Sequence, residues 1–534
     1  MADHETPDYE AGQDNIQIMG LDVHNPVFAI SALTIVAFVV FSLVFQEQAE
    51  SFFGWLRPAL TSRFDWVFMA AGNIFVLFAL FLIVTPYGAI RLGGADAKPD
   101  YSYMGWFSML FAAGMGIGLV FWGVAEPISH YGASLGGTAV ENGMRTDWAP
   151  LGAAADDPEG ARTLAMAATV FHWGLHPWAV YAVVALALAF FSFNRGLPLT
   201  MRSVFYPIFG EATWGPLGHV IDVLAVFATI FGLATSLGLG ASQAMAGLNY
   251  LFGVPVSDGM KVVLIAGITA FALVSVVAGL DKGVKRLSEL NMILAAVLLL
   301  LVLVVGPTLA ILTGFFDNLW SYAANLPALS GITGRDDTNF RQGWTAFYWA
   351  WWISWSPFVG MFIARISRGR TIREFVFCVL IIPTIVGALW MSVFGGAALD
   401  QVMGGAGGAL QEAALELKMF TMFEAFPLTG ILSLIGIILV VVFFVTSSDS
   451  GSLVIDTITA GGKTDAPTAQ RVFWCVLEGA IAIVLLLGGG LGALQAAAIA
   501  TGFPFAIVLV LMCVSVLLGV VRERRRYVIS SRGA

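Results

Sequence analysis

The sequence has few charged residues and almost no cysteine. Only 11% of its 534 residues are Asp, Glu, Lys or Arg, whereas soluble domains carry about 25%. This excludes a soluble enzyme, because several soluble domains would need more charged surface. The net charge of −9 excludes a nucleic-acid binder, which needs a basic surface. Three cysteines in apolar stretches, Cys378, Cys475 and Cys513, provide no disulfide framework.

The sequence is rich in long apolar segments, and 58% of its residues are hydrophobic. A transmembrane helix needs about 20 mostly apolar residues. We predict twelve spans, at residues 25–45, 65–91, 102–131, 162–192, 216–250, 258–280, 284–313, 340–366, 372–396, 429–459, 467–488 and 491–520. The expected fold is an all-α polytopic membrane protein. Its membrane domain covers residues 25–520, between an acidic tail at 1–24 and a short basic tail at 521–534.

The distribution of basic residues indicates the orientation of the chain. An even number of spans puts both termini on one side, and 18 of the 26 Lys and Arg residues then lie on that side. Cytoplasmic loops carry the excess of Lys and Arg. We therefore expect a multi-pass protein of the inner (cytoplasmic) membrane with both termini in the cytoplasm. In the connection at 314–339, the segment Phe315–Leu326 has the spacing of an amphipathic helix on the membrane surface.

Two spans contain residues that disfavour a continuous helix. Gly114, Gly116 and Gly118 alternate in the third span, and each costs about 1 kcal/mol relative to Ala. These glycines could admit a closely packed neighbour, or they could let the helix unwind beside a cavity. Pro357 removes a backbone donor from the eighth span. Because these spans begin two five-span units, spans 3–7 and 8–12, we expect broken helices at matching positions, typical of transporters with a midplane site.

Aromatic residues concentrate inside two spans. Five tryptophans fall within Trp344–Trp355, and the fourth span adds Trp173, Trp178 and Tyr181. Interfacial aromatic belts lie at helix ends, whereas these clusters lie inside their spans. Indole faces attract quaternary ammonium groups by about 0.5–2 kcal/mol per contact. The clusters therefore suggest a cage for a bulky organic cation, with simple helix packing as the alternative.

Hydroxyl groups are dense in the tenth span, at Thr446, Ser447, Ser448 and Ser450. Oxygen ligands suit a hard cation such as sodium. Hydrogen bonds between helices, or back to the preceding turn, are the alternative. The sequence pattern leaves both open.

Other polar residues inside the spans give weaker signals. His172 and His176 are four residues apart, but Pro177 disturbs that helix, and we favour packing over a metal site or an enzyme active site. Asp449 and Asp456 could relay protons or could be buried, hydrogen-bonded acids. The pattern does not separate these two roles.

The segment Trp344–Glu374 resembles the signature of the betaine/choline/carnitine transporter family. Gly114–Pro127 and His172–Tyr181 resemble two further motifs of that family, and the likeness extends over residues 25–520. The resemblance implies the inverted-repeat fold of sodium-coupled leucine transporters, with two extra N-terminal spans. It also implies assembly as a homotrimer.

The resemblance also implies site residues. The substrate would be held by the cage residues Trp173, Trp178, Tyr181 and Trp352, by Trp351 and Trp355 on the access path, and by Met115, Gly116 and Gly118. Sodium would be bound by the backbone carbonyls of Ala112, Met115 and Phe443 and the hydroxyls of Thr446 and Ser447. A second, weaker sodium site would involve Thr229 near Phe358, where Leu233 replaces the expected second threonine.

These residues predict a secondary active transporter rather than an enzyme. We expect import of a methylated-onium zwitterion, glycine betaine in the first place, by sodium symport and alternating access. Gly118 favours a zwitterion, since family members that carry choline tend to have an acid at that position. The alternatives are choline, carnitine, trimethylamine N-oxide or dimethylsulfoniopropionate, and sodium-independent exchange. Sodium is the coupling ion, and membrane lipid is the other expected partner.

Overall fold

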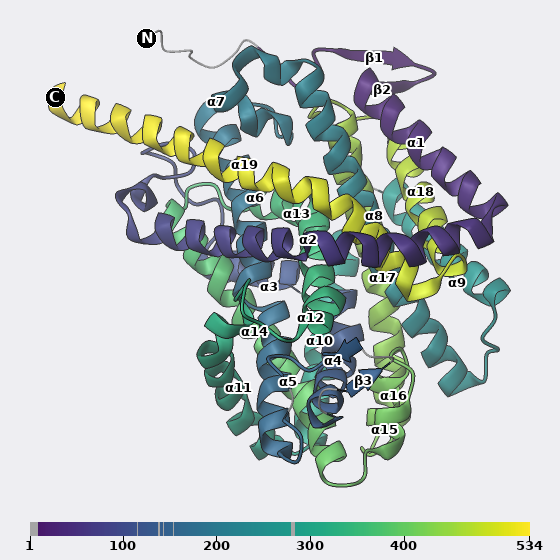
Figure 1. Ribbon diagram of the computed structural model, residues 1–534. Coiled ribbons are helices and arrows are strands. Elements are labelled where there is room, and N and C mark those ends of the chain that lie inside the picture. The colour runs from purple at the N-terminus through teal and green to yellow at the C-terminus, as the bar shows by residue number, and fades with distance from the viewer. Residues whose placement is uncertain are drawn as a thin grey trace.

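The protein is predominantly helical, as expected (Figure 1). The computed structural model describes residues 9–114, 116–136, 139–141, 144–152, 154–278 and 284–533. Within these ranges, ten helices are long and apolar enough to cross a membrane, which confirms an all-α polytopic membrane protein. The count of twelve is not reproduced. The two predicted spans without a counterpart among the ten are the third and the eighth, the pair in which we expected broken helices.

The first half of the chain contains nine α-helices and three short 3₁₀ segments within the described residues. The helices are α1 (Asn25–Val44), α2 (Gln46–Val84), α3 (Tyr103–Gly114), α4 (Ile117–Gly136), α5 (Pro158–Trp173), α6 (Leu175–Arg195), α7 (Tyr206–Phe209), α8 (Pro216–Phe252) and α9 (Asp258–Ala278). The 3₁₀ segments are η1 (Pro86–Ala89), η2 (Arg202–Phe205) and η3 (Gly210–Trp214).

The second half contains ten further α-helices in the part that the structure describes. They are α10 (Val284–Val305), α11 (Thr308–Leu329), α12 (Thr338–Phe340), α13 (Ala346–Arg365), α14 (Ile372–Met403), α15 (Gly408–Glu412), α16 (Lys418–Phe423), α17 (Thr429–Thr459), α18 (Thr468–Leu487) and α19 (Gly490–Gly533). A π-helical turn, η4 (Arg341–Thr345), leads into α13.

The third span is interrupted as predicted, and the fourth is interrupted as well. Helix α3 ends at Gly114 and α4 begins at Ile117; Met115 lies outside the described residues. Helices α5 and α6 are separated at Gly174, whose φ of −99° and ψ of −133° leave the helical region. A Cβ on Gly174 would lie 2.6 Å from the carbonyl oxygen of Val170 and 2.9 Å from the hydroxyl of Tyr322. This break therefore requires glycine, a need that the sequence did not reveal.

The expected break of the eighth span at Pro357 is wrong. Helix α13 runs without interruption through Pro357. Proline cannot donate to the carbonyl four residues earlier, which belongs to Ile353. The hydroxyl of Ser356 donates to that carbonyl at 2.7 Å instead. A neighbouring side chain thus satisfies the group that proline leaves free, and the helix continues.

Helix α13 forms the centre of the bundle. It packs against α6, α8 and α19, while α14 packs against α4 and α6, and α17 lies along α8 (Figure 1). The large aromatic side chains of α13 are consequently buried, Tyr348, Trp349 and Trp351 among them. The interrupted third and fourth spans therefore meet the aromatic face of α13 inside the protein.

The strictly all-α expectation misses two short antiparallel hairpins. One joins β1 (Asn15–Ile18) and β2 (Leu21–His24), and the other joins β3 (Ala139–Glu141) and β4 (Met144–Thr146). The first belongs to the predicted N-terminal tail. The amide of Asn15 donates to the carbonyl of Ala460 at 2.9 Å, and Lys463 forms a 2.6 Å ion pair with Asp22. This part of the tail is thus attached to the connection between α17 and α18.

Two segments were predicted as a separate surface helix and a short tail, and in the structure each belongs to a longer helix, α11 and α19. The predicted amphipathic segment lies in α11, where Phe316 and Trp320 are exposed and Asn318 and Tyr322 are buried. At the other end, the predicted basic tail is helical. It continues the last span, and the yellow end of α19 projects away from the bundle in Figure 1.

Candidate functional site

One internal cavity gathers the sequence-predicted substrate residues. It has a free volume of about 40 Å³, so its walls lie close together. Eight of the nine predicted residues line it: Gly116, Gly118, Trp173, Trp178, Tyr181, Trp351, Trp352 and Trp355. The ninth, Met115, lies outside the described residues. Ile117, Leu119, Pro177, Ser236, Pro383 and Gly387 complete the lining, and they extend it to α8 and α14.

The aromatic rings form a connected set with their faces at different angles. Trp351 and Trp352 are stacked, with centroids 5.2 Å apart and an interplanar angle of 16°. Trp173 meets Trp352 edge to face, at 4.9 Å and 80°. Tyr181 meets Trp352 in the same manner, at 6.0 Å and 85°, and also contacts Trp178. Faces and edges of several rings thus surround one small space, as an onium group requires.

Four of the indole N–H groups are already bonded within the protein. The acceptors are Glu126 Oε2 for Trp173 (2.8 Å), Ser236 Oγ for Trp351 (3.1 Å), the His172 carbonyl for Trp352 (3.0 Å) and the Gly232 carbonyl for Trp355 (2.8 Å). These bonds fix the rings in place. These four rings therefore present their aromatic faces rather than their N–H groups to a ligand, which suits a cation.

Gly118 has a packing role at this site. A Cβ at this position would lie 2.7 Å from Cη2 of Trp351 and 2.8 Å from Cη2 of Trp173. Such separations are shorter than van der Waals contact, so any side chain would displace the two indoles. The glycine pattern of the third span therefore serves close packing and helix interruption together, the two readings that the sequence left open.

The break in the fourth span positions Trp173. This residue ends α5, and the next helix begins at Leu175. The backbone N–H of Leu175 donates to the Tyr322 hydroxyl at 3.1 Å. Helix α11 thereby satisfies a donor that the interruption exposes and holds the end of α5 beside the cavity.

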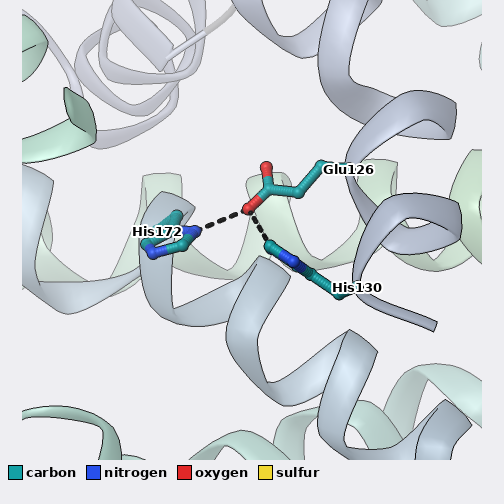
Figure 2. Close-up of side chains that lie close together, drawn as sticks. All are labelled: Glu126, His130 and His172. Atoms are coloured by element: carbon teal, nitrogen blue, oxygen red, sulfur yellow. Dashed lines mark hydrogen bonds and ion pairs between the residues drawn. The ribbon is translucent and has the colours of Figure 1, made fainter. Parts of the chain in front are cut away.

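A fully buried carboxylate adjoins the cavity wall, and the sequence analysis missed it. Glu126 on α4 accepts from His172 Nδ1 at 2.6 Å and from His130 Nε2 at 3.1 Å, both through Oε1 (Figure 2). Its Oε2 accepts from Trp173 at 2.8 Å and from the Tyr348 hydroxyl at 2.5 Å. Glu126 lies inside a motif that we recognised. Its signal was an acid within an otherwise apolar span, and such acids are functional candidates by default.

Glu126, His130 and His172 could also offer three metal ligands, because their atoms lie within 4.8 Å of one another. Figure 2 shows the two imidazoles directed at the same carboxylate oxygen. As arranged, the cluster is a hydrogen-bonded network centred on the carboxylate, and among the described residues only His130 Nδ1 of its side-chain nitrogens and oxygens lacks a partner. His176 is not part of it; this imidazole stacks on Trp349 and contacts Asn73 at 3.0 Å.

The predicted sodium ligands Phe443, Thr446 and Ser447 lie on α17. The Thr446 hydroxyl donates back to the carbonyls of Val442 at 3.0 Å and Phe443 at 3.2 Å, which is the bonding to the preceding turn that the sequence left open as the alternative. It also accepts a hydrogen bond from Asn291 on α10, a neighbour that the sequence did not indicate. Ser447 is buried beside it. Of the predicted ligands on the third span, Ala112 ends up in α3 and Met115 lies outside the described residues.

The weaker sodium candidates have other contacts. Thr229 is buried and donates to the Ala225 carbonyl at 2.7 Å. Leu233, at the position where a threonine was expected, lies against Gly451 of α17. Phe358 contacts Trp355, with ring centroids 5.3 Å apart. Thr229 thus has the back-bonded geometry of a hydroxyl inside a helix.

Two acids of α17 are hydrogen-bonded inside the protein. Asp449 forms a 2.8 Å ion pair with Arg471 and accepts from Ser275 at 2.5 Å. Asp456 accepts from Gln470 at 3.0 Å. These contacts favour the buried, hydrogen-bonded alternative for both acids.

A polytopic helical membrane protein whose interrupted spans enclose an aromatic cavity has the architecture of a transporter. The chain belongs to the betaine/carnitine/choline family of transporters, whose model matches residues 26–525. It is therefore a transporter and not an enzyme, as expected.

Curated relatives of this chain are bacterial transporters. A glycine betaine/proline/choline transporter of Vibrio parahaemolyticus is 64% identical over 97% of this chain and 94% of its own length. Glycine betaine transporter 1 of the same organism is 55% identical over 98% of both chains. A glycine betaine transporter of Bacillus subtilis is 44% identical over 93% of this chain and 94% of its own length.

Proposed function

We propose that this protein imports glycine betaine across the inner membrane by sodium-coupled symport and alternating access. The observation that carries the proposal is the cavity itself, where the indoles of Trp173, Trp351 and Trp352 meet beside the interrupted third span. The N–H groups of these three indoles are bonded within the protein, so the rings offer a ligand their aromatic faces, and these attract a methylated cation. The names of the relatives support the same substrate class.

The carboxylate of the zwitterion needs a partner at the other end of the cavity. Helix α4 begins at Ile117, directly after Gly116, and both residues line the cavity. The first turn of a helix carries unpaired backbone N–H groups and a partial positive charge, which attract an anion. We therefore place the substrate carboxylate near the start of α4 and its onium group among the indoles.

Sodium coupling is supported by the oxygen atoms on α17. The Thr446 hydroxyl and the Phe443 carbonyl are joined by a 3.2 Å hydrogen bond, which a cation bound to both oxygens would replace, and Ser447 follows directly. Sodium is a hard cation that takes such neutral oxygens. We propose that it bridges α17 and the interrupted third span through the backbone of Ala112 and Met115 as well. Its binding would then stabilise the third span in the shape that the substrate requires.

The remaining features of the proposal concern topology and assembly. They are twelve spans with an inverted repeat of spans 3–7 and 8–12, both termini in the cytoplasm, and a homotrimer in the lipid bilayer. The family resemblance and the distribution of Lys and Arg support them. Light scattering of the purified protein measures the assembly, and a monomer would contradict the trimer.

A thermal-shift panel on the purified protein tests the substrate and the ion together. The ligands are glycine betaine, choline, proline, carnitine, trimethylamine N-oxide and dimethylsulfoniopropionate, each in sodium chloride and in potassium chloride. A bound ligand raises Tm by mass action. We expect the largest increase with betaine, and only in sodium. An equal increase in potassium contradicts sodium coupling, and a larger increase with another solute replaces betaine as the substrate.

A further inference from the structure

Glu126 is a fully buried acid inside the membrane domain, and none of its hydrogen-bond partners is a permanent cation. Within the described part of the chain, its four hydrogen-bond partners are two imidazoles, an indole and a phenol, with neither Lys nor Arg among them. An ionisable group at such a depth is costly and is retained where function needs it.

The four contacts fit an ionised carboxylate. The indole N–H of Trp173 can only donate, so Oε2 is an acceptor. Oε1 is shared by two imidazole nitrogens, and a carboxylate has lone pairs for both. On the far side of its ring, His172 Nε2 lies 2.9 Å from the Thr345 hydroxyl, which can donate to it. His130 Nδ1 has no hydrogen-bond partner among the described residues, so a second proton on that ring would be unpaired. Both imidazoles can therefore be neutral donors, which leaves the negative charge on Glu126.

Trp173 connects this charge to the cavity. Its N–H is bonded to Glu126, and its ring lines the cavity beside Trp351 and Trp352. Hydrogen bonds polarise the groups that they join, more strongly at low dielectric. An indole that donates to a carboxylate is richer in electrons on its face, and that face attracts a cation more strongly.

We propose that Glu126 is a specificity-determining positioning residue, which selects a positively charged substrate head group through the Trp173 ring that it holds. The carboxylate needs no direct contact with the substrate. It sets the orientation of the indole and supplies a fixed negative charge behind the cavity wall. The proposal rests on the proposed function, since it assumes that an onium group occupies the cavity.

The test compares two ligands of nearly equal shape. Glycine betaine carries a trimethylammonium group, and 3,3-dimethylbutanoate carries a tert-butyl group in its place, with no positive charge. Isothermal titration in sodium chloride gives Kd for both ligands with the parent protein and with Glu126→Gln, whose amide oxygen can still accept hydrogen bonds. We expect Glu126→Gln to weaken betaine binding about tenfold and to leave the affinity for 3,3-dimethylbutanoate within about twofold.

Two further variants make the result decisive. Glu126→Asp keeps the charge but moves it away from Trp173. The preference for betaine should therefore fall, by a smaller factor than in Glu126→Gln. The matched control is Glu478→Gln on α18, another fully buried acid, held by Ser448 at 2.8 Å and absent from the cavity lining. It should leave the affinity ratio of the two ligands unchanged.

Each outcome has one meaning. The inference is overturned if Glu126→Gln and Glu126→Asp both leave the preference for betaine unchanged. It is also overturned if the variants lose affinity equally for the two ligands, because that result indicates a purely structural role. If Glu126→Gln does not fold, the ratio measured with Glu126→Asp decides. A parent protein that binds neither ligand contradicts the proposed function instead, so the two failures are distinguishable.

Discussion

Trp173 and Trp352 meet edge to face, with ring centroids 4.9 Å apart and an interplanar angle of 80°. The two residues are far apart in the sequence, at the end of α5 and in the middle of α13. Their contact forms because the fourth span is interrupted directly after Trp173. The indole N–H of Trp352 also donates to the carbonyl of His172, the residue before Trp173.

Replacement of Trp352 should weaken transport. Trp352→Leu removes a ring that contacts Trp173, Trp351 and Tyr181, together with the hydrogen bond to His172. We expect the KM for betaine uptake to rise at least about tenfold, with normal amounts of protein in the membrane. Uptake of radiolabelled betaine into proteoliposomes measures this. Trp66→Leu, at a largely exposed indole of α2, is the control, and equal effects of the two variants would contradict the cage.

A methyl group at Gly118 should obstruct the site. Gly118→Ala places a Cβ 2.7–2.8 Å from the rings of Trp351 and Trp173, so both indoles must shift. We expect weaker betaine binding by about tenfold or more, read as a change in Kd by titration. Gly132→Ala in the same helix, where a Cβ has open space, should bind as the parent does. Unchanged binding in Gly118→Ala would show that the cavity opens away from this glycine.

Loss of the Ser447 hydroxyl should alter the response to sodium. If Ser447 is a ligand, Ser447→Ala should raise the sodium concentration for half-maximal uptake about tenfold and leave the maximal rate at saturating sodium largely intact. Ser433→Ala, at another buried serine of α17, is the matched control. Identical sodium dependence in Ser447→Ala and the parent would remove Ser447 from the site.

The interruption of the fourth span should depend on Tyr322. Tyr322→Phe removes the oxygen that accepts the Leu175 N–H and leaves this partly buried donor without that partner. An unpaired buried donor costs about 1–3 kcal/mol, so Tm in detergent should fall by several degrees. Tyr87→Phe, at a tyrosine outside this contact, controls for the loss of a hydroxyl. Gly174→Ala should be still more harmful, and a stable, active Gly174→Ala protein would contradict the account of the break.

Acid should destabilise the N-terminal attachment through His24. Burial, and then the neighbouring charges of Arg202 and His219, lower the pKa of His24 from 6.5 to about 4. The unfolded chain therefore takes up the proton first, and stability is complete above pH 6.5 and falls as the pH decreases towards 4. Tm of the parent should fall between pH 7 and pH 5, and that of His24→Gln should fall less. Equal decreases would assign the effect to other groups.

Local sequence patterns predicted much of the site, because helix periodicity and residue chemistry act over short distances. The tryptophan pattern of α13 and the aromatic residues near His172 predicted which side chains meet. The glycines of the third span predicted its interruption. Pro357 misled the prediction, because one hydroxyl, on Ser356, satisfies the carbonyl that proline leaves free. The break at Gly174 could not be predicted, because the sequence does not distinguish this glycine from the many others. Its role depends on a contact with Tyr322 of α11.

The sequence by itself determined that this protein lies in a membrane, that it is helical, and that its spans carry clusters of indoles and hydroxyls. Composition and periodicity suffice for these, because the lipid environment imposes them on every span. Only the tertiary structure decided where the negative charge beside the cavity lies. Glu126 on α4, His172 and Trp173 on α5, and Tyr348 on α13 meet through the packing of three helices. Such a contact has no local sequence signature, since each of its hydrogen bonds to α5 and α13 joins residues far apart in the chain.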